Sequence, residues 1–195
     1  MSKIETNTIA PSTGTTLTLG ESGDTVQVGT GATASGFGGI TMADQWRVTT
    51  AFSGDAAPIA NNWERNDTAP SLSYFGSQMS ESSGIFTFPS TGIYEIHFMI
   101  QYKLDGSDSV ANQSFIQGTT NNSSYVNLTE ASTNIIHGGS GDLYSSSTQT
   151  ALVDITDTST HKVRFSVSLA NSGVEMSANT ARDILAVRFI RLGDT

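Results

Sequence analysis

The chain has 195 residues, enough for one domain of roughly 150 residues and a short extension. Nine basic residues stand against eighteen acidic ones, so the formal net charge is −9. A nucleic-acid binder needs clustered Lys and Arg to displace counterions from phosphates, so this composition argues against nucleic acid as a partner. The absence of cysteine excludes disulfides, thiolate metal sites and a catalytic thiol.

The composition also bounds the fold class. Ser and Thr outnumber the charged residues, and there are 19 glycines. Hydroxyl-bearing and β-branched residues suit strands and tight turns, whereas the runs of Ala, Leu, Glu and Lys that favour helices are missing. No apolar run reaches the roughly 18–20 residues needed to cross a bilayer, and no signal peptide is expected. We therefore expect an all-β protein without membrane insertion.

Residues 1–42 differ from the rest and are predicted to form an N-terminal arm that ends in a Gly-rich linker. Two short alternating segments, Thr16–Gly20 and Thr25–Gly29, are predicted strands. Two strands of this length bury too little apolar surface to stand alone in water. They therefore need neighbouring chains or a surface to lie on. A loosely ordered arm is the alternative interpretation.

Residues 43–195 are predicted to form a head domain. Loops rich in Gly, Ser, Asn and Asp separate nine strand-like segments: Gln45–Phe52, Ser71–Gln78, Gly84–Phe88, Ile93–Lys103, Asn112–Gly118, Ser124–Leu128, Ser147–Asp154, Lys162–Ala170 and Ile184–Leu192. Such spacing is typical of sandwiches and barrels. Eight or nine antiparallel strands in about 150 residues fit a two-sheet jelly roll, which buries most of its edges.

The segment Ile93–Lys103 is the most informative of the nine. Large apolar side chains recur at every second position along it: Tyr94, Ile96, Phe98, Ile100 and Tyr102. Because successive side chains of a strand point to opposite sides of the sheet, these five are predicted to face the core. The opposite side is neither plainly solvated nor plainly core: Glu95, His97, Met99 and Gln101. That mixture suggests a second buried surface, against another copy of the chain.

The last predicted strand is apolar on both sides. Leu185, Val187 and Phe189 make one face, and the opposite face holds Ile184, Ala186, Arg188, Ile190 and Leu192. A strand that is apolar on both sides is covered on both sides, either by a second copy or within a single domain. Glu95 and Arg188 are predicted to pair near such a contact, because an unpaired charge on a buried face is costly.

These residues carry a resemblance to a known superfamily. The chain resembles the trimeric jelly rolls of the tumour necrosis factor and complement globular-head superfamily over about residues 44–195, through Gly84-x-Phe86-x-Phe88-x-x-x-Gly92-x-Tyr94-x-Ile96-x-Phe98 and Leu185-x-Val187-x-Phe189-Ile190-x-Leu192. The resemblance implies a parallel homotrimer whose inner-sheet strands meet at the three-fold axis. The implied trimer-interface residues are Glu95, His97, Met99, Gln101, Ala186, Arg188 and Ile190.

The N-terminal segment carries a second resemblance, between Lys3 and Val26. Its pattern of Lys3-Ile4, Asn7-Thr8-Ile9-Ala10-Pro11-Ser12, Gly14–Gly20 and Ser22–Val26 is similar to the start of many virion structural proteins of tailed phages, especially marine ones. The resemblance implies an anchor fused to a displayed head. The expected anchor residues are Ile4, Ile9, Leu17, Leu19, Val26 and Val28.

Together the two resemblances imply a virion structural protein, assembled in the host cytoplasm. In the favoured interpretation a trimeric fibre or spike is held by its arm to other virion proteins, and its head attaches to the host surface. The alternative is a capsid decoration protein that binds and stabilises the phage head. Tyr125 and Tyr144 are candidate receptor contacts, with a host glycan as the expected ligand, because recognition surfaces use Tyr, Ser, Asn and Gly. Trp46, in an alternating strand, is predicted to be core.

No sequence signature of a catalytic, metal or cofactor site is found, so we expect none of them. The histidines are His97, His137 and His161, and no His-Glu-x-x-His pair occurs. Three copies of His97 at a trimer axis could converge on an anion, a water or a metal. Asp105 and Asp108 have the spacing of turn caps, with a weak Ca²⁺ site as the alternative. A depolymerase is the enzyme alternative, and paired carboxylates lining a groove would indicate it.

Overall fold

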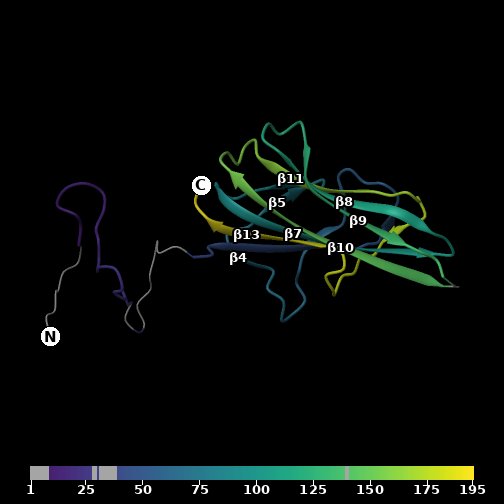
Figure 1. Cartoon of the computed structure of the whole chain (residues 1–195), viewed down its shortest axis with the longest axis horizontal. Coiled ribbons are helices and arrows are strands. Elements are labelled where there is room, and N and C mark those ends of the chain that lie inside the picture. The colour runs from purple at the N-terminus through teal and green to yellow at the C-terminus, as the bar shows by residue number, and fades with distance from the viewer. Residues whose placement is uncertain (1–8, 28–29, 31–38, 139–140) are drawn as a thin grey trace. The chain divides into compact units, whose positions relative to one another are not determined.

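The computed structural model describes residues 9–27, 30, 39–138 and 141–195. The chain divides into two compact units, Met1–Phe37 and Gly38–Thr195. Every regular element in the described residues is a strand (Figure 1). Within the described ranges, no helix is long and apolar enough to cross a membrane.

The described part of the first unit contains a turn and no strand. The backbone N–H of Asp24 donates to the carbonyl of Glu21 at 3.0 Å, and the Asp24 carboxylate accepts the Glu21 N–H at 2.8 Å. The strands predicted at Thr16–Gly20 and Thr25–Gly29 are therefore wrong for residues 16–20 and 25–27, whereas 28–29 lie outside the described residues. Strand alternation has no effect without a partner to accept the backbone hydrogen bonds.

The second unit is a sandwich of two antiparallel sheets. Sheet A has the strand order β2 (Phe52–Ser53), β12 (Glu175–Met176), β7 (Gly92–Asp105), β13 (Ala186–Gly193), β1 (Met42–Val48) and β3 (Trp63–Arg65), with β10 (Asp142–Ile155) paired to β7 and β4 (Tyr74–Gly76) paired to β1. Sheet B has the order β5 (Ser80–Ser82), β6 (Ile85–Thr87), β11 (Lys162–Ser168), β8 (Ser109–Thr119) and β9 (Val126–Ile135). This arrangement confirms the all-β, two-sheet jelly roll.

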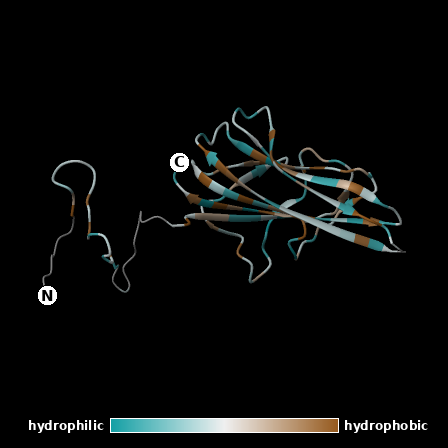
Figure 2. Ribbon diagram, viewed as in Figure 1, coloured by the Kyte–Doolittle hydropathy of each residue, from teal (hydrophilic) through white to brown (hydrophobic). Residues whose placement is uncertain are grey.

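The core lies between the sheets and follows the predicted alternation. The five alternating apolar residues of β7 are buried, as are Leu185, just before β13, and Val187 and Phe189 within β13. Phe86 sits at the centre, with its ring centroid 5.2–5.6 Å from those of Trp46, Trp63, Phe165 and Phe189. Figure 2 shows the alternation as brown and teal bands along the strands. The prediction that Trp46 is core is confirmed.

A glycine turn fixes where β7 begins and thereby places both of its faces. Gly92 has φ 143°, and a Cβ there would lie 2.5 Å from the carbonyl oxygen of Gly193. Two positions later, the Tyr94 hydroxyl donates to the carbonyl of Ser90 at 2.9 Å and closes the turn. The Gly-x-Tyr spacing thus has a physical cause, because glycine admits the end of β13 and tyrosine ties down the loop.

All nine predicted head strands overlap observed ones, but their lengths differ. The predicted segment Ser124–Leu128 becomes β9, which runs on to Ile135, and β10 starts five residues before the predicted Ser147. The extra residues are mostly polar and lie on edge strands, so periodicity alone does not reveal them. The short strands β3, β5 and β12 were not predicted, because two or three residues carry no alternation.

Candidate self-association surface on sheet A

The predicted interface residues lie together on one side of sheet A. This side, which we call the outer face, looks away from sheet B, because the buried side chains of β7 point to the core. In the β7–β13 register, Glu95 is opposite Ile190, His97 is opposite Arg188, and Met99 is opposite Ala186. Ala186 is buried, Arg188 is exposed, and the other residues of the set, Gln101 included, are half-buried in the single chain.

The outer face is more apolar at one end than at the other. Near the start of β1, one row crosses five strands: Leu152, Glu95, Ile190, Ala43 and Phe75. At the opposite end, the row is polar, and Lys103 forms ion pairs with Asp142 at 3.0 Å and Glu175 at 4.0 Å. Apolar contact with another surface is therefore available mainly at the end near Met42.

The charges on the outer face are only partly satisfied within one chain. Arg188 Nε donates to Gln45 Oε1 at 3.2 Å. Among the ion pairs of the described residues, none joins Glu95 to Arg188 or involves either of them. Burial, together with the positive charge of Arg188, lowers the pKa of His97 below its ordinary value, and Glu95 opposes this shift. The predicted Glu95–Arg188 pair is therefore absent within the single chain, and pairing between copies stays a prediction.

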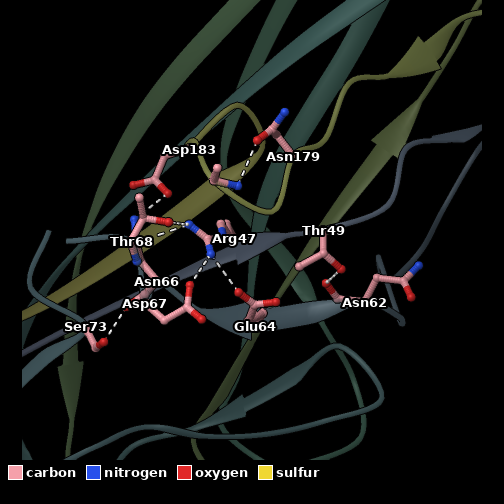
Figure 3. Close-up of polar contacts among 11 residues, drawn as sticks. Arg47, Thr49, Asn62, Glu64, Asn66, Asp67, Thr68, Ser73, Asn179 and Asp183 are labelled. Carbon is pink, nitrogen blue, oxygen red and sulfur yellow. Dashed lines mark hydrogen bonds and ion pairs between the residues drawn. The ribbon is translucent and has the colours of Figure 1, made fainter.

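Arg47 occupies the same side of the sheet but is fully buried, which the sequence did not predict. Its Nη1 donates to Asn66 at 3.3 Å and to Thr68 at 2.9 Å, and its Nη2 lies 2.7 Å from Glu64 and 2.5 Å from Asp67 (Figure 3). A guanidinium presents several donors in a fixed plane, so it can hold several segments at once. Arg47 thereby fixes the chain after β3 against β1.

The Arg47 network extends to the loop before the last strand. The Asn66 side-chain N–H donates to Asp183 Oδ1 at 2.7 Å, so residues far apart in sequence are joined (Figure 3). Asp183 lines a small hollow of the outer face beside His97, Met99 and Arg188. The network therefore shapes the surface on which the predicted interface residues lie.

A pocket opens beside β10, the strand at one edge of sheet A, between the two sheets. Farther along this side, Gln149 donates to Ser114 at 2.9 Å and accepts from Thr129 at 2.7 Å, which joins β8, β9 and β10. Beyond these bonds lies a pocket of about 340 Å³ whose apolar wall includes Val153 and Ile155. Three exposed apolar residues border it, and we call them the Leu152 edge: Val126, Leu128 and Leu152.

At the edge of sheet A across from β10, a second group of exposed apolar side chains lies beside β1. We call it the Leu72 edge: Leu72, Tyr74 and Phe75. A hollow of about 280 Å³ lies there, lined by Leu72 and Tyr74 together with Gln45 and Arg188. Neither edge was predicted, because apolar residues within polar loops or polar strand faces carry no periodic signal.

The two candidate receptor tyrosines lie at different ends of the head. Tyr144 is exposed on β10, opposite Lys103 in register. Tyr125 is half-buried just before β9, and the Arg164 guanidinium lies 4.1 Å from its ring centroid. Burial raises the pKa of Tyr125, and Arg164 opposes the rise. The two residues therefore do not form one patch, and Tyr144 is the more accessible.

The predicted anchor residues are exposed where they are described. Ile9, Leu17, Leu19 and Val26 all expose large parts of their side chains, whereas Ile4 and Val28 lie outside the described residues. Their exposure leaves these side chains available for contact with another protein, but exposure alone does not identify a partner. The anchor role stays a prediction.

Chemistry-bearing residues are dispersed over the described part of the chain. No group of three or more His, Asp or Glu residues there could hold a metal ion. Asp108 accepts the backbone N–H of His137 at 2.5 Å, so its carboxylate joins two loops that are distant in sequence and does not cap its own turn. Paired carboxylates, which would indicate a depolymerase, are not found in five surface hollows of the described residues. Each hollow is lined by a single carboxylate: Asp154, Asp44, Asp183, Asp183 again and Asp55.

Comparison with family models and curated proteins finds no match, whereas comparison with solved structures finds similar folds. No protein-family model matches the chain, and no curated protein matches it. Murine APRIL at pH 5.0 has a similar structure, with a TM-score of 0.55 and 12% identity over 77% of this chain and 98% of that chain. An Eiger TNF from S. frugiperda gives a TM-score of 0.57 and 13% identity over 78% of this chain and 93% of that chain. At such identities the similarity shows the fold alone: the chain has a TNF-like jelly roll.

Proposed function

We propose that the chain is a structural protein of a tailed-phage virion, displayed as a parallel homotrimer on the particle. The observation that carries the proposal is the arm pattern from Lys3 to Val26, joined to a separate TNF-like jelly-roll head. In this arrangement the arm docks onto other virion proteins, and the head faces outward to attach to a host surface. The mechanism is adhesive, and no chemical step is involved.

Trimer formation is supported by the state of the outer face in the single chain. Its central residues are half-buried, and it carries apolar side chains beside Glu95 and Arg188, which form no ion pair among the described residues. Each apolar side chain that becomes fully buried would contribute about 1.5–3 kcal/mol. The lost freedom of association offsets part of this gain, so several such residues are needed.

The anchoring role of the arm is tested by deletion. Particles assembled with the chain lacking residues 1–37 should contain none of the protein, whereas the shortened protein should still fold, because the core lies wholly within the second unit, Gly38–Thr195. Immunoblotting of purified particles measures incorporation, and circular dichroism of the purified head checks folding. A shortened protein that still decorates particles would show that the anchor assignment is wrong.

The attachment role predicts an exposed recognition surface on the head. Tyr144→Ser should reduce adsorption of particles to host cells, because an exposed aromatic ring supplies a stacking surface for a sugar. Val110→Ser is the matched control, since Val110 is equally exposed but aliphatic. Equal adsorption of both variants and the unaltered particle would remove Tyr144 from the proposed receptor site.

Capsid decoration is the second candidate, favoured by the short connection between arm and head. Only residues 28–41 separate Gln27 from the start of β1 at Met42. At 3.3–3.6 Å per residue, such a segment spans at most about 50 Å even when fully extended. The head would then stay close to the surface that binds the arm. Cryo-electron microscopy of the particle distinguishes a fibre or spike from a capsid decoration by position.

A further inference from the structure

The solvent side of sheet B carries an aromatic ring among polar side chains. On β8, Ser114 bonds across the sandwich to Ser147 of β10 at 3.0 Å, and Ile116 is buried, so both point inward. Phe115, between them, therefore points away from the core, and it is half-buried. We call this surface the Phe115 face: Gln113, Phe115, Gln117, Glu130 and Arg164.

Arg164 is fixed in orientation on this face but has no counter-charge. Its Nε donates to Gln117 Oε1 at 2.7 Å, and its guanidinium lies 4.1 Å from the ring centroid of Tyr125. No ion pair of the described residues includes Arg164, and no hydrogen bond among them uses its Nη groups. Lys162, two positions earlier on β11, adds a second positive charge on the same side of a chain whose net charge is −9. The two Nη groups are therefore available to hold an anion through parallel hydrogen bonds.

Amide side chains of β8 are held in place on either side of Phe115. Gln117 Nε2 donates to Asn127 Oδ1 at 2.8 Å, and Gln113 Nε2 donates to Glu130 Oε1 at 2.5 Å. A carboxylate and an amide oxygen each accept more than one hydrogen bond, so hydroxyl donors can still bind to them. Polar groups that are already ordered lose little freedom when a ligand binds.

Phe115 lies between the positive and the negative group of its face. Its direct neighbours in register are Ser166 on β11 and Glu130 on β9, and Arg164 is its diagonal neighbour, at a Cα distance of about 7–8 Å. Ser166 is 2% exposed, and its hydroxyl has no hydrogen-bond partner within the part of the chain that the structure describes. Buried hydroxyls are usually paired, so this face holds hydrogen-bonding capacity that the chain itself does not use.

From this arrangement we propose that the Phe115 face binds an acidic saccharide of the uronic-acid type. The sugar ring stacks on Phe115, the carboxylate is bound by the Nη groups of Arg164, and sugar hydroxyls donate to Glu130 and Gln113. Tyr125 is a positioning residue, because it acts through the guanidinium that it stacks on. A neutral sugar would leave the guanidinium without a counter-charge, whereas a dense polyanion would meet the Glu130 carboxylate.

The inference rests on the proposed attachment role and names the chemical class of the receptor. Sheet B faces away from the outer face of sheet A, so self-association through sheet A leaves the Phe115 face open. The site is distinct from Tyr144, which lies on β10 of sheet A.

Binding of the full-length protein to immobilised sugars tests the ligand class. The probes are hexasaccharides of galacturonate, glucuronate, mannuronate and guluronate, each beside its carboxyl-reduced counterpart, and biolayer interferometry measures the dissociation constants. At least one acidic probe should bind, and carboxyl reduction should weaken its binding by about tenfold or more, because charge-assisted hydrogen bonds are lost. Failure of every acidic probe to bind, or equal binding of the reduced counterparts, would overturn the inference.

Two variants test the residues of the site. Arg164→Gln should raise the dissociation constant of the acidic probe by about tenfold or more without changing that of its reduced counterpart. Phe115→Thr should weaken binding of both probes by about fivefold or more, since the stacking surface is lost. Thermal unfolding checks that both variants fold.

The matched controls are Arg182→Gln, at an exposed arginine outside sheet B, and Val110→Thr, at an exposed apolar residue of β8 outside the Phe115 face. Both should leave the dissociation constants unchanged. An Arg182→Gln variant that binds as weakly as Arg164→Gln would show that only net charge matters, and would overturn the site.

The outcomes separate this inference from the proposed function. A protein that is present on particles but binds no acidic probe would show that the ligand assignment is wrong, and the virion role would stand. A protein that binds an acidic probe through Arg164 but is absent from particles would confirm the site and overturn the virion role.

Discussion

At the scale of single residues, two buried charged side chains of β1, Asp44 and Arg47, hold neighbouring segments of the chain against this strand. Asp44 is buried in β1 and accepts the Arg65 Nε–H at 3.1 Å and the Met79 N–H at 2.7 Å. Arg65 also stacks on Trp46, with its guanidinium carbon 4.3 Å from the ring centroid. Arg47, two strand positions beyond Gln45, holds the opposite side of the same strand. Charged groups thus fasten the irregular chain between β3 and β5 to both faces of β1.

Arg47→Met should lower the free energy of unfolding by about 2 kcal/mol, because Asn66 loses a buried donor and Glu64 loses its ion pair. Urea denaturation followed by fluorescence measures the change. Arg182→Met is the control: this arginine is exposed, so the substitution should change stability by no more than about 0.5 kcal/mol. Equal stability of the two variants would show that the Arg47 network contributes nothing.

The lowered pKa of His97 predicts that the stability of the folded chain depends on pH. Burial and Arg188 lower its pKa in the folded chain, so below pH 6.5 the unfolded chain binds more protons than the folded one. Stability should therefore fall as the pH drops from about 6.5 towards the lowered pKa of His97. Glu95 and Arg188 face the ring from β7 and β13, and Thr150 is opposite it on β10. In His97→Gln, thermal unfolding should vary less over this pH range; an unchanged profile contradicts the assignment.

At the scale of elements, β7 organises sheet A. It is paired along one side by β10 over its whole length and along the other by β13 and β12. One of its faces fills the core, and the other carries the predicted interface. The turn at Gly92 sets the register of both, because it places the start of β7 against the end of β13.

Gly92→Ala should lower the free energy of unfolding by about 2–4 kcal/mol, since the new Cβ would overlap the Gly193 carbonyl and strain the backbone. Gly106→Ala is the matched control: Gly106 also has a positive φ, but a Cβ added there would meet no atom within 4 Å, so only about 1 kcal/mol should be lost. Chemical denaturation of both variants measures the difference. Similar losses would mean that the contact with Gly193 is unimportant.

At the scale of the whole molecule, an acidic chain is divided into an arm with exposed apolar side chains and a head with a complete core. The described residues before Met42 contribute nothing to the core of the head, so the second unit, Gly38–Thr195, should fold without the first. What the head lacks is cover for its outer face and for the Leu152 and Leu72 edges. Under the proposed function, other virion proteins would cover the exposed apolar side chains of the arm, and further copies of the head would cover these surfaces.

The second unit alone, residues 38–195, should sediment as a trimer at micromolar concentration. Because association stabilises the folded protein but not the unfolded chain, the midpoint of thermal unfolding should rise with protein concentration. Analytical ultracentrifugation and calorimetry over a tenfold concentration range measure the two effects. A well-behaved monomer whose midpoint does not depend on concentration would contradict the proposed assembly.

The sequence by itself determined the fold class, the main strands of the head and the two faces of β7 and β13. These features are local, because a period of two along one strand is sufficient to assign its buried side. The same argument fails for the arm: Thr16–Gly20 alternates as a strand does, yet forms none in the described residues, since alternation supplies no partner.

Only the tertiary structure decided which residues meet across strands. Leu152, Ile190 and Phe75 fall in one row although they are far apart in the chain, because pairing of β10, β7, β13, β1 and β4 sets their neighbours. Burial of Arg47 likewise depends on residues 64–68 folding back over β1. The pattern along a strand is written in its own residues, whereas the composition of a surface depends on the registers of all the strands that form it.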